Sequence, residues 1–197
     1  MNPQIMNEFW LYFKLGLNHV LDIQAYDHVL FIIVLVAAYN FSNWKRLLGL
    51  VSLFTLGHTI SLLLASYDIV SVSSSVIEFL IPITILVTAF FNLIATRKSN
   101  HSDRIVLFYL ITLFFGLIHG FGFATYFNMI KDDTTILPLL EFALGIELAQ
   151  IIIVIIVLII SFIFQTFLRF HKRDWILIIS SMVIGMVIPM LIENWPF

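Results

Sequence analysis

The stretch around which this chain is organised reads N-H-V-L-D-I-Q-A-Y-D-H-V-L-F-I-I-V-L-V-A-A-Y, residues 18–39. It places His19, Asp22, Asp27 and His28 directly before a run of apolar residues. Ionisable groups at the mouth of a membrane span are costly and rare, and they are by default functional. The stretch therefore predicts a membrane-spanning helix and a functional site at its start.

The composition of the whole chain is that of a membrane protein. Of its 197 residues, 61% are hydrophobic and 11% charged, and the mean hydropathy is +1.05, whereas an ordinary soluble domain has about 25% charged residues. The net charge of −2 is too small to indicate a nucleic acid partner. The absence of cysteine excludes disulfides, thiolate metal sites and a cysteine nucleophile. We expect no removable signal peptide, because no basic segment followed by a small-residue cleavage site opens the chain.

The apolar runs predict an all-α polytopic membrane protein with six transmembrane helices, each near the roughly 20 residues that cross about 30 Å of hydrocarbon. A short amphipathic helix at residues 5–23 precedes them. We expect it to lie at the membrane interface, with Trp10 and Tyr12 at headgroup level. The whole chain, residues 1–197, is predicted to form one integral membrane domain. The approximate spans are residues 25–41, 45–66, 75–96, 105–127, 137–167 and 175–193.

The connections between the predicted spans differ in charge. Lysine and arginine gather in the first, third and fifth connections, at residues 43–46, 97–104 and 169–173. The second and fourth connections, residues 67–74 and 128–135, carry three aspartates against one lysine. The positive-inside rule then places the basic connections in the cytoplasm and both termini outside it.

Acidic and imidazole side chains recur in the outer half of five predicted spans. The helical rise of about 1.5 Å per residue places His58 and His119 each roughly 12 Å from the outer end of their spans, and Glu147 roughly 15 Å. We expect the polar residues of these spans to meet in one pocket beneath the outer membrane surface. They are Asp27 and His28, His58, Glu78, His119 and Glu147.

Imidazole nitrogen and carboxylate oxygen are ligands that suit borderline divalent ions such as Ni²⁺, Co²⁺, Zn²⁺ and Fe²⁺ better than Cu(I). Three imidazoles and two carboxylates would complete a four- to six-coordinate site. The predicted metal ligands are His28, Asp27, His58, His119 and Glu147. Further candidates are His19, Glu78 and Gln150. Gln150 lies one helical turn from Glu147, so that its amide could orient the carboxylate.

Small residues in the same segments predict close helix contacts around the site. Glycine at a helix surface lets two backbones approach without intervening side chains. The glycines concerned are Gly57, Gly116, Gly120, Gly122 and Gly145.

Five stretches carry a resemblance to a known family, and they cover most of residues 16–150 in the family's order. They read H-V-L-D-I-Q-A-Y-D-H-V-L-F, F-T-L-G-H-T-I-S-L, I-E-F-L-I-P-I-T-I, F-G-L-I-H-G-F-G-F and F-A-L-G-I-E-L-A-Q. In these stretches the chain resembles the HupE/UreJ family of bacterial membrane proteins, in the branch found in Bacteroidetes-type bacteria. The family's motif residues carry over to His19, Asp27, His28, His58, Glu78, His119 and Glu147.

The resemblance implies a six-helix protein of the bacterial cytoplasmic membrane with nickel, or a related divalent metal, as cargo. Family members accompany hydrogenase or urease systems as permeases, which implies metalloenzyme-maturation proteins as partners. A homo-oligomer is left open. The first functional hypothesis is therefore a metal permease that captures its ion at Asp27 and His28 from outside.

The second hypothesis is an intramembrane metal-dependent hydrolase acting on a lipid or lipoprotein from the outer leaflet. Three histidines would hold zinc with one open position, and such a zinc lowers the pKa of its bound water to about 7. Glu147 or Asp27 would then be the general base. A helper that hands metal to a membrane complex without catalysis is the third hypothesis.

Overall fold

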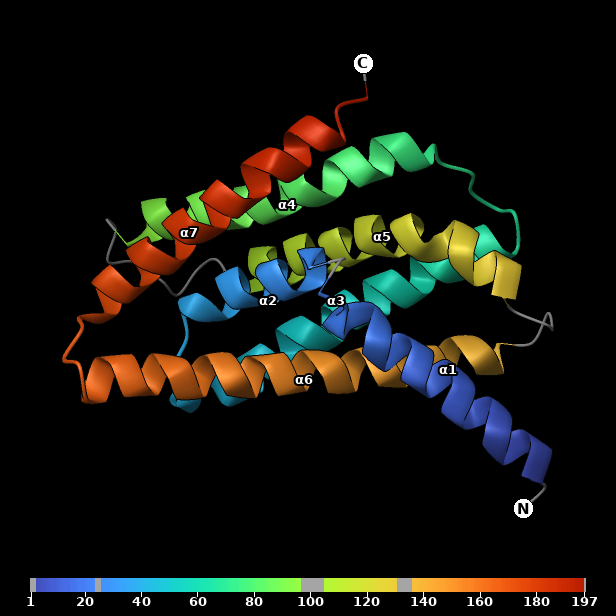
Figure 1. Ribbon diagram of the computed structural model, residues 1–197, viewed down its shortest axis with the longest axis horizontal. Coiled ribbons are helices and arrows are strands. Elements are labelled where there is room, and N and C mark those ends of the chain that lie inside the picture. The colour runs from blue at the N-terminus through green and yellow to red at the C-terminus, as the bar shows by residue number, and fades with distance from the viewer. Residues whose placement is uncertain (1–2, 24–25, 97–104, 131–135, 197) are drawn as a thin grey trace.

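A computed structural model describes residues 3–23, 26–96, 105–130 and 136–196 of the chain. These residues form an all-helical bundle, as predicted (Figure 1). Its elements are α1 (Pro3–Leu21), α2 (Asp27–Ala37), the 3₁₀ helix η1 (Phe41–Asn43), α3 (Trp44–Ser66), α4 (Ser74–Ala95), α5 (Ile105–Ile130), α6 (Leu137–Thr166) and α7 (Lys172–Glu193).

Five of the described helices, α3 to α7, are long and apolar enough to cross a membrane. Their bounds agree with the predicted spans to within a few residues, because each apolar run is set off from the next by polar residues. The chain is thus a multi-pass membrane protein by the length and composition of its helices. The longest, α6, has 30 residues and would measure about 45 Å.

The predicted first span, residues 25–41, is not a full crossing. The helix found there is α2, which has only 11 residues and a length of about 16 Å, half of the hydrocarbon thickness. It begins at Asp27 and ends at Ala37, and a new 3₁₀ turn starts where the Asn40 backbone N–H donates to Asn43 Oδ1. Six full-length spans are therefore not confirmed.

Helices α1 and α2 together lead through the bundle with a break in the middle. In Figure 1, α1 runs from the N-terminal end of the bundle to its centre, and α2 continues from the centre to the end where α3 begins. The start of α2 consequently lies among the other helices rather than at an end of the bundle. Interruptions of helical structure at such depth are tolerated where the non-helical backbone is enclosed by protein or lines a cavity.

Helix α1, predicted to lie at the interface, packs closely on α6. A Cβ added to Gly16 would collide with the carbonyl of Phe142, and one added to Gly145 would collide with the carbonyl of Phe13. Tyr12 is buried whereas Trp10 is half exposed, so only the tryptophan ring is available to headgroups.

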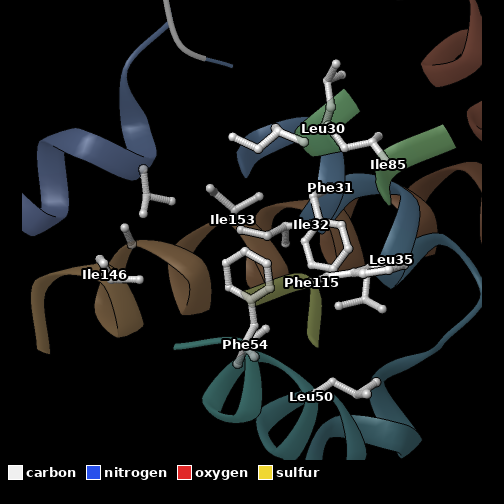
Figure 2. Packing of buried hydrophobic residues seen from close by; sticks show 14 of the residues in the cluster. Leu30, Phe31, Ile32, Leu35, Leu50, Phe54, Ile85, Phe115, Ile146 and Ile153 are labelled. Carbon is white, nitrogen blue, oxygen red and sulfur yellow. The ribbon is translucent and has the colours of Figure 1, made fainter. Parts of the chain in front are cut away.

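The apolar core surrounds α2. Figure 2 shows Leu30, Phe31, Ile32 and Leu35 of α2 among side chains of the longer helices. The rings of Phe31 and Phe54 stack with centroids 4.8 Å apart. A helix that is apolar on all sides is stable only when it is enclosed in this way or by lipid.

Glycines set the contact between α3 and α5. A Cβ on Gly57 would collide with the carbonyl of Leu113, and one on Gly116 with the carbonyl of Phe54. A Cβ on Gly120 would collide with the carbonyl of His58. The two backbones therefore touch at the level of the predicted site, as the small residues predicted.

Candidate metal centre

Four histidines and one aspartate meet inside the bundle, and we call them the imidazole cluster. His19, Asp27 and His28 are near one another in the sequence, whereas His58 and His119 are distant from them. The end of α1 and the start of α2 lie where α3 and α5 cross. His19 comes from the last turn of α1, Asp27 and His28 open α2, His58 lies on α3 and His119 on α5. His28, His58 and His119 are each at most 2% exposed.

Ligand atoms in the cluster lie close enough to bind a metal ion. They fall into two groups, His19–His28–His58 and Asp27–His28–His119, and within each group one ligand atom per residue lies within 4.8 Å of the others. The centroid of the His28 ring lies 4.7 Å from that of the His19 ring and 5.0 Å from that of the His119 ring. His28 is common to both groups and is their centre.

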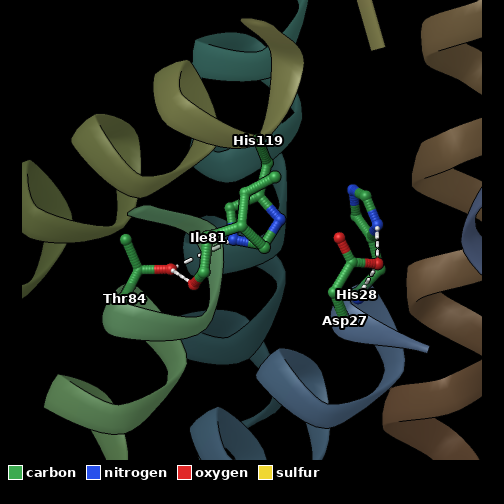
Figure 3. A network of polar contacts seen from close by, with 5 residues as sticks. All are labelled: Asp27, His28, Ile81, Thr84 and His119. Carbon is green, nitrogen blue, oxygen red and sulfur yellow. Dashed lines mark hydrogen bonds and ion pairs between the residues drawn. The ribbon is translucent and has the colours of Figure 1, made fainter. Parts of the chain in front are cut away.

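Asp27 orients the ring of His28. Asp27 Oδ1 lies 3.0 Å from His28 Nδ1 and also accepts the backbone N–H of His28 at 2.8 Å (Figure 3). Because a carboxylate can only accept hydrogen bonds, Nδ1 carries the proton. The lone pair of His28 is then on Nε2. This carboxylate–imidazole pairing is the usual support of a metal-bound histidine.

Thr84 of α4 orients His119 in a similar way. The Thr84 hydroxyl donates to the carbonyl of Ile81 at 2.7 Å, and its oxygen lies 3.1 Å from His119 Nε2 (Figure 3). Since the hydroxyl proton is used on Ile81, the oxygen accepts from Nε2–H. The lone pair of His119 is then on Nδ1.

Several ring nitrogens of the cluster are buried without a hydrogen-bond partner. Buried polar atoms are nearly always paired, and leaving one unpaired costs about 1–3 kcal/mol. In His28 and His119 the unpaired atom is the one that carries the lone pair, which is what a bound cation requires. The atoms are His19 Nε2, His28 Nε2, His58 Nδ1 and Nε2, and His119 Nδ1. This donor set fits a borderline divalent ion.

Aromatic rings enclose the cluster. The Phe123 ring lies 4.0 Å from that of His19, and the Phe54 ring 5.0 Å from that of His119. His58 lies 6.1 Å from the Phe142 ring. Such apolar walls exclude water that would compete for the ligand nitrogens, and they strengthen every electrostatic contact between the ligands and a cation.

A cavity of about 920 Å³ leads to the cluster. His19, Asp27, His28 and His119 are part of its wall, together with apolar side chains such as Phe123. The exposed carboxylates of Asp22 and Glu78 also line it. Glu78 stands in the first turns of α4, so the cavity is near the bundle end at which α4 begins.

The structure brings together Asp27, His28, His58 and His119 from the predicted ligand set, and it adds the candidate His19. Glu78 lines the cavity but belongs to neither group. The position of a residue along a helix does not show which way its side chain faces. Two predicted residues, Glu147 and Gln150, are therefore placed differently from the prediction.

Glu147, predicted as a ligand, is not part of the cluster. It is half-buried on α6, and Ser52 of α3 donates to its Oε1 at 2.5 Å. Gln150, predicted to orient it, makes no hydrogen bond to it: the Gln150 amide oxygen accepts from Thr55 at 3.4 Å, and the buried amide nitrogen has no partner. The hydrolase hypothesis thereby loses Glu147 as a base beside the imidazoles.

Sequence reasoning missed Thr84. Its signal is weak, because a threonine in an apolar helix commonly bonds to the preceding turn of its own helix, as Thr88 does with the Thr84 carbonyl at 2.9 Å. The contact between Thr84 and His119 depends on α5 lying beside α4, which the sequence does not show.

The family model described as HupE / UreJ protein matches residues 1–194. The chain belongs to the HupE/UreJ family. No curated protein and no solved structure matches it. Membership in the HupE/UreJ family, with the histidine and aspartate groups, indicates a role in handling nickel or a related metal, as an accessory protein or a permease.

Proposed function

We propose that the protein is a permease for a divalent transition metal, with Ni²⁺ as its first candidate cargo, in the bacterial cytoplasmic membrane. The observation that carries the proposal is the set of buried, unpaired imidazole nitrogens that four helices contribute, on residues whose ligand atoms lie close together in groups of three. A purely structural polar cluster would pair these atoms with one another or with the backbone.

The cavity supports an entry route for a cation. Asp22 and Glu78 are exposed at its wall, and Asp27 stands next to His28 farther in. Carboxylates in an apolar cleft focus a negative potential that raises the local concentration of cations. The ion would shed water gradually as it exchanges these oxygens for imidazole nitrogens.

The broken α1–α2 segment supports transport rather than surface binding. Transporters commonly bind their cargo at discontinuous helices near the membrane midplane. Polar groups also continue beyond the cluster, since Thr55 lies one turn from His58 towards the start of α3 and contacts Gln150. The Thr55 hydroxyl and the Gln150 amide oxygen are the oxygen atoms of this pair, and oxygen is the atom type that a passing divalent cation could contact.

The charge of the connections supports an orientation for the permease. Lys45 and Arg46 open α3, and Arg169, Lys172 and Arg173 lie at the connection from α6 to α7. The basic residues at 97–104 lie outside the described residues. The proposal places this end in the cytoplasm and the cavity and both termini outside. Metalloenzyme-maturation proteins would then receive the metal at the cytoplasmic end.

Metal uptake by reconstituted vesicles tests the proposal. We expect vesicles containing the purified chain to accumulate Ni²⁺ with saturating kinetics, and faster than protein-free vesicles of the same lipid. Co²⁺ and Zn²⁺ should compete, because they accept the same nitrogen and oxygen ligands. Equal accumulation in both kinds of vesicle would contradict the permease.

Replacing Thr84 by valine should weaken Ni²⁺ binding by about 10- to 100-fold, the usual effect of losing a hydrogen bond that orients a metal ligand. Valine keeps the shape but cannot accept from His119 Nε2–H, so the ring loses its fixed tautomer. Titration calorimetry of the purified protein measures the change. Thr84→Ser should retain nearly the wild-type affinity, and equal losses in both variants would contradict this role of the hydroxyl.

A further inference from the structure

We propose that the imidazole cluster holds its divalent ion at two alternative, overlapping positions that share His28. The outer position is Asp27–His28–His119 and the inner position is His19–His28–His58. This inference rests on the proposed function, because it assigns to a metal permease the two stations between which its cargo moves.

The grouping of ligand atoms is the first observation. His58 and His119 lie on neighbouring helices, yet they fall into different groups, and His28 is the only residue that the two groups have in common. The rings of His19 and His58 are 5.6 Å apart, and neither is grouped with Asp27. The cluster therefore offers two sets of three ligands.

Access from outside is the second observation. All three residues of the outer position line the cavity. His58 does not line it and is 0% exposed. His19 and His28 of the inner position also line the cavity, so His58 is the only ligand set behind its wall. An ion that enters through the cavity therefore meets all three ligands of the outer position there, whereas the inner position is complete only at His58.

The chemistry of the ligands differs between the positions. The outer position combines one carboxylate oxygen with two imidazoles, which suits an ion that still carries water. The inner position offers three imidazoles inside aromatic walls, which requires an ion that has lost most of its water. At the outer position, the negative charge of Asp27 offsets part of the free-energy cost of removing water from the ion.

His28 can serve only one ion at a time. A neutral imidazole has one lone pair, because one of its two ring nitrogens carries the proton. Two ions would compete for this lone pair, and each chain therefore binds one. During transfer the ion keeps His28 as a ligand while it exchanges Asp27 and His119 for His19 and His58, so it is never bare in an apolar environment.

Cobalt spectroscopy of the full-length protein in detergent tests the two positions, since Co²⁺ reports its ligands through its visible absorption. Asp27→Asn and His119→Gln each remove a ligand of the outer position. Asparagine keeps a side-chain oxygen that can accept from His28 Nδ1–H, so the His28 ring shared by both positions stays oriented. His19→Gln and His58→Gln each remove a ligand of the inner position only. His28→Gln removes a ligand of both.

We expect the four single variants to fall into two spectral classes, each still binding one Co²⁺ per chain. Asp27→Asn and His119→Gln should share one spectrum, and His19→Gln and His58→Gln another. His28→Gln should raise the dissociation constant by at least about 100-fold, which corresponds to about 2.7 kcal/mol. Should His58→Gln fail to fold, His19→Gln, at the cavity wall, tests the inner position by itself.

One common spectrum for all four variants would overturn the two positions, as would loss of the ion in each variant as complete as in His28→Gln. Two Co²⁺ ions per wild-type chain would also overturn them, because His28 could not be shared. Failure of the permease is a separate result: two spectral classes without vesicle uptake would support the two positions and contradict transport. No Co²⁺ binding to the wild type would contradict both.

Discussion

Replacing His28 by glutamine should reduce Ni²⁺ uptake to the level of protein-free vesicles. His28 belongs to both ligand groups, and its ring lies between those of His19 and His119 at 4.7 and 5.0 Å. Glutamine fills much of the same volume but offers only a weak amide ligand. No other described residue would replace the missing nitrogen in both groups, so we expect at least a 100-fold loss of initial rate, about 2.7 kcal/mol.

The matched control is His171→Gln, which makes the same substitution in an exposed histidine before α7. This variant should transport as fast as the wild type, since His171 lies in the basic connection and not in the imidazole cluster. Initial uptake rates at equal protein content compare the two variants. If His28→Gln retained uptake similar to that of His171→Gln, the imidazole cluster would not be on the path of the metal.

The five long helices could be predicted because hydropathy reports where a long apolar run begins and ends. The same signal failed at residues 25–41, where the uninterrupted apolar run, residues 29–39, is shorter than the roughly 20 residues of a full span. Asp27 sits in the first turn of α2, where a negative charge and an acceptor for the next N–H are favourable. Asn40 and Asn43 then start a separate turn. These local hydrogen bonds are invisible to an average over apolar residues.

The sequence predicts those ligands whose place in the site follows from their depth along a helix. His58 and His119 share a depth, and the glycines beside them let α3 and α5 come into contact. Glu147 has a similar depth, but its carboxylate accepts a hydrogen bond from Ser52 and belongs to neither group of ligands. Rotation about a helix axis is set by packing with its neighbours, which one apolar helix sequence does not reveal.

Replacing Gly116 by alanine should destabilise the protein by about 1–3 kcal/mol, the usual cost of forcing extra volume into a packed contact. The new Cβ would lie within 2.9 Å of the Phe54 carbonyl carbon and within 3.0 Å of its Cα. These are backbone atoms, which cannot rotate away as a side chain can. Helices α3 and α5 would have to move apart.

Gly185→Ala on α7 is the matched control, because a Cβ at Gly185 meets nothing within 4 Å. The same change there should be neutral or stabilising by up to about 1 kcal/mol, since alanine favours helix more than glycine. Thermal unfolding in detergent compares the two midpoints, and equal midpoints would contradict the close backbone contact.

Gly116→Ala also tests whether the contact between α3 and α5 affects metal binding. Gly116 lies one turn before His119 on α5, and Phe54 lies one turn before His58 on α3. Helices forced apart at this level would carry His119 away from His28, so Gly116→Ala should weaken Co²⁺ binding even where the protein remains folded. Gly185→Ala should not. A Gly116 variant that lost stability but kept its affinity would show that the contact between α3 and α5 supports the fold without positioning the ligands.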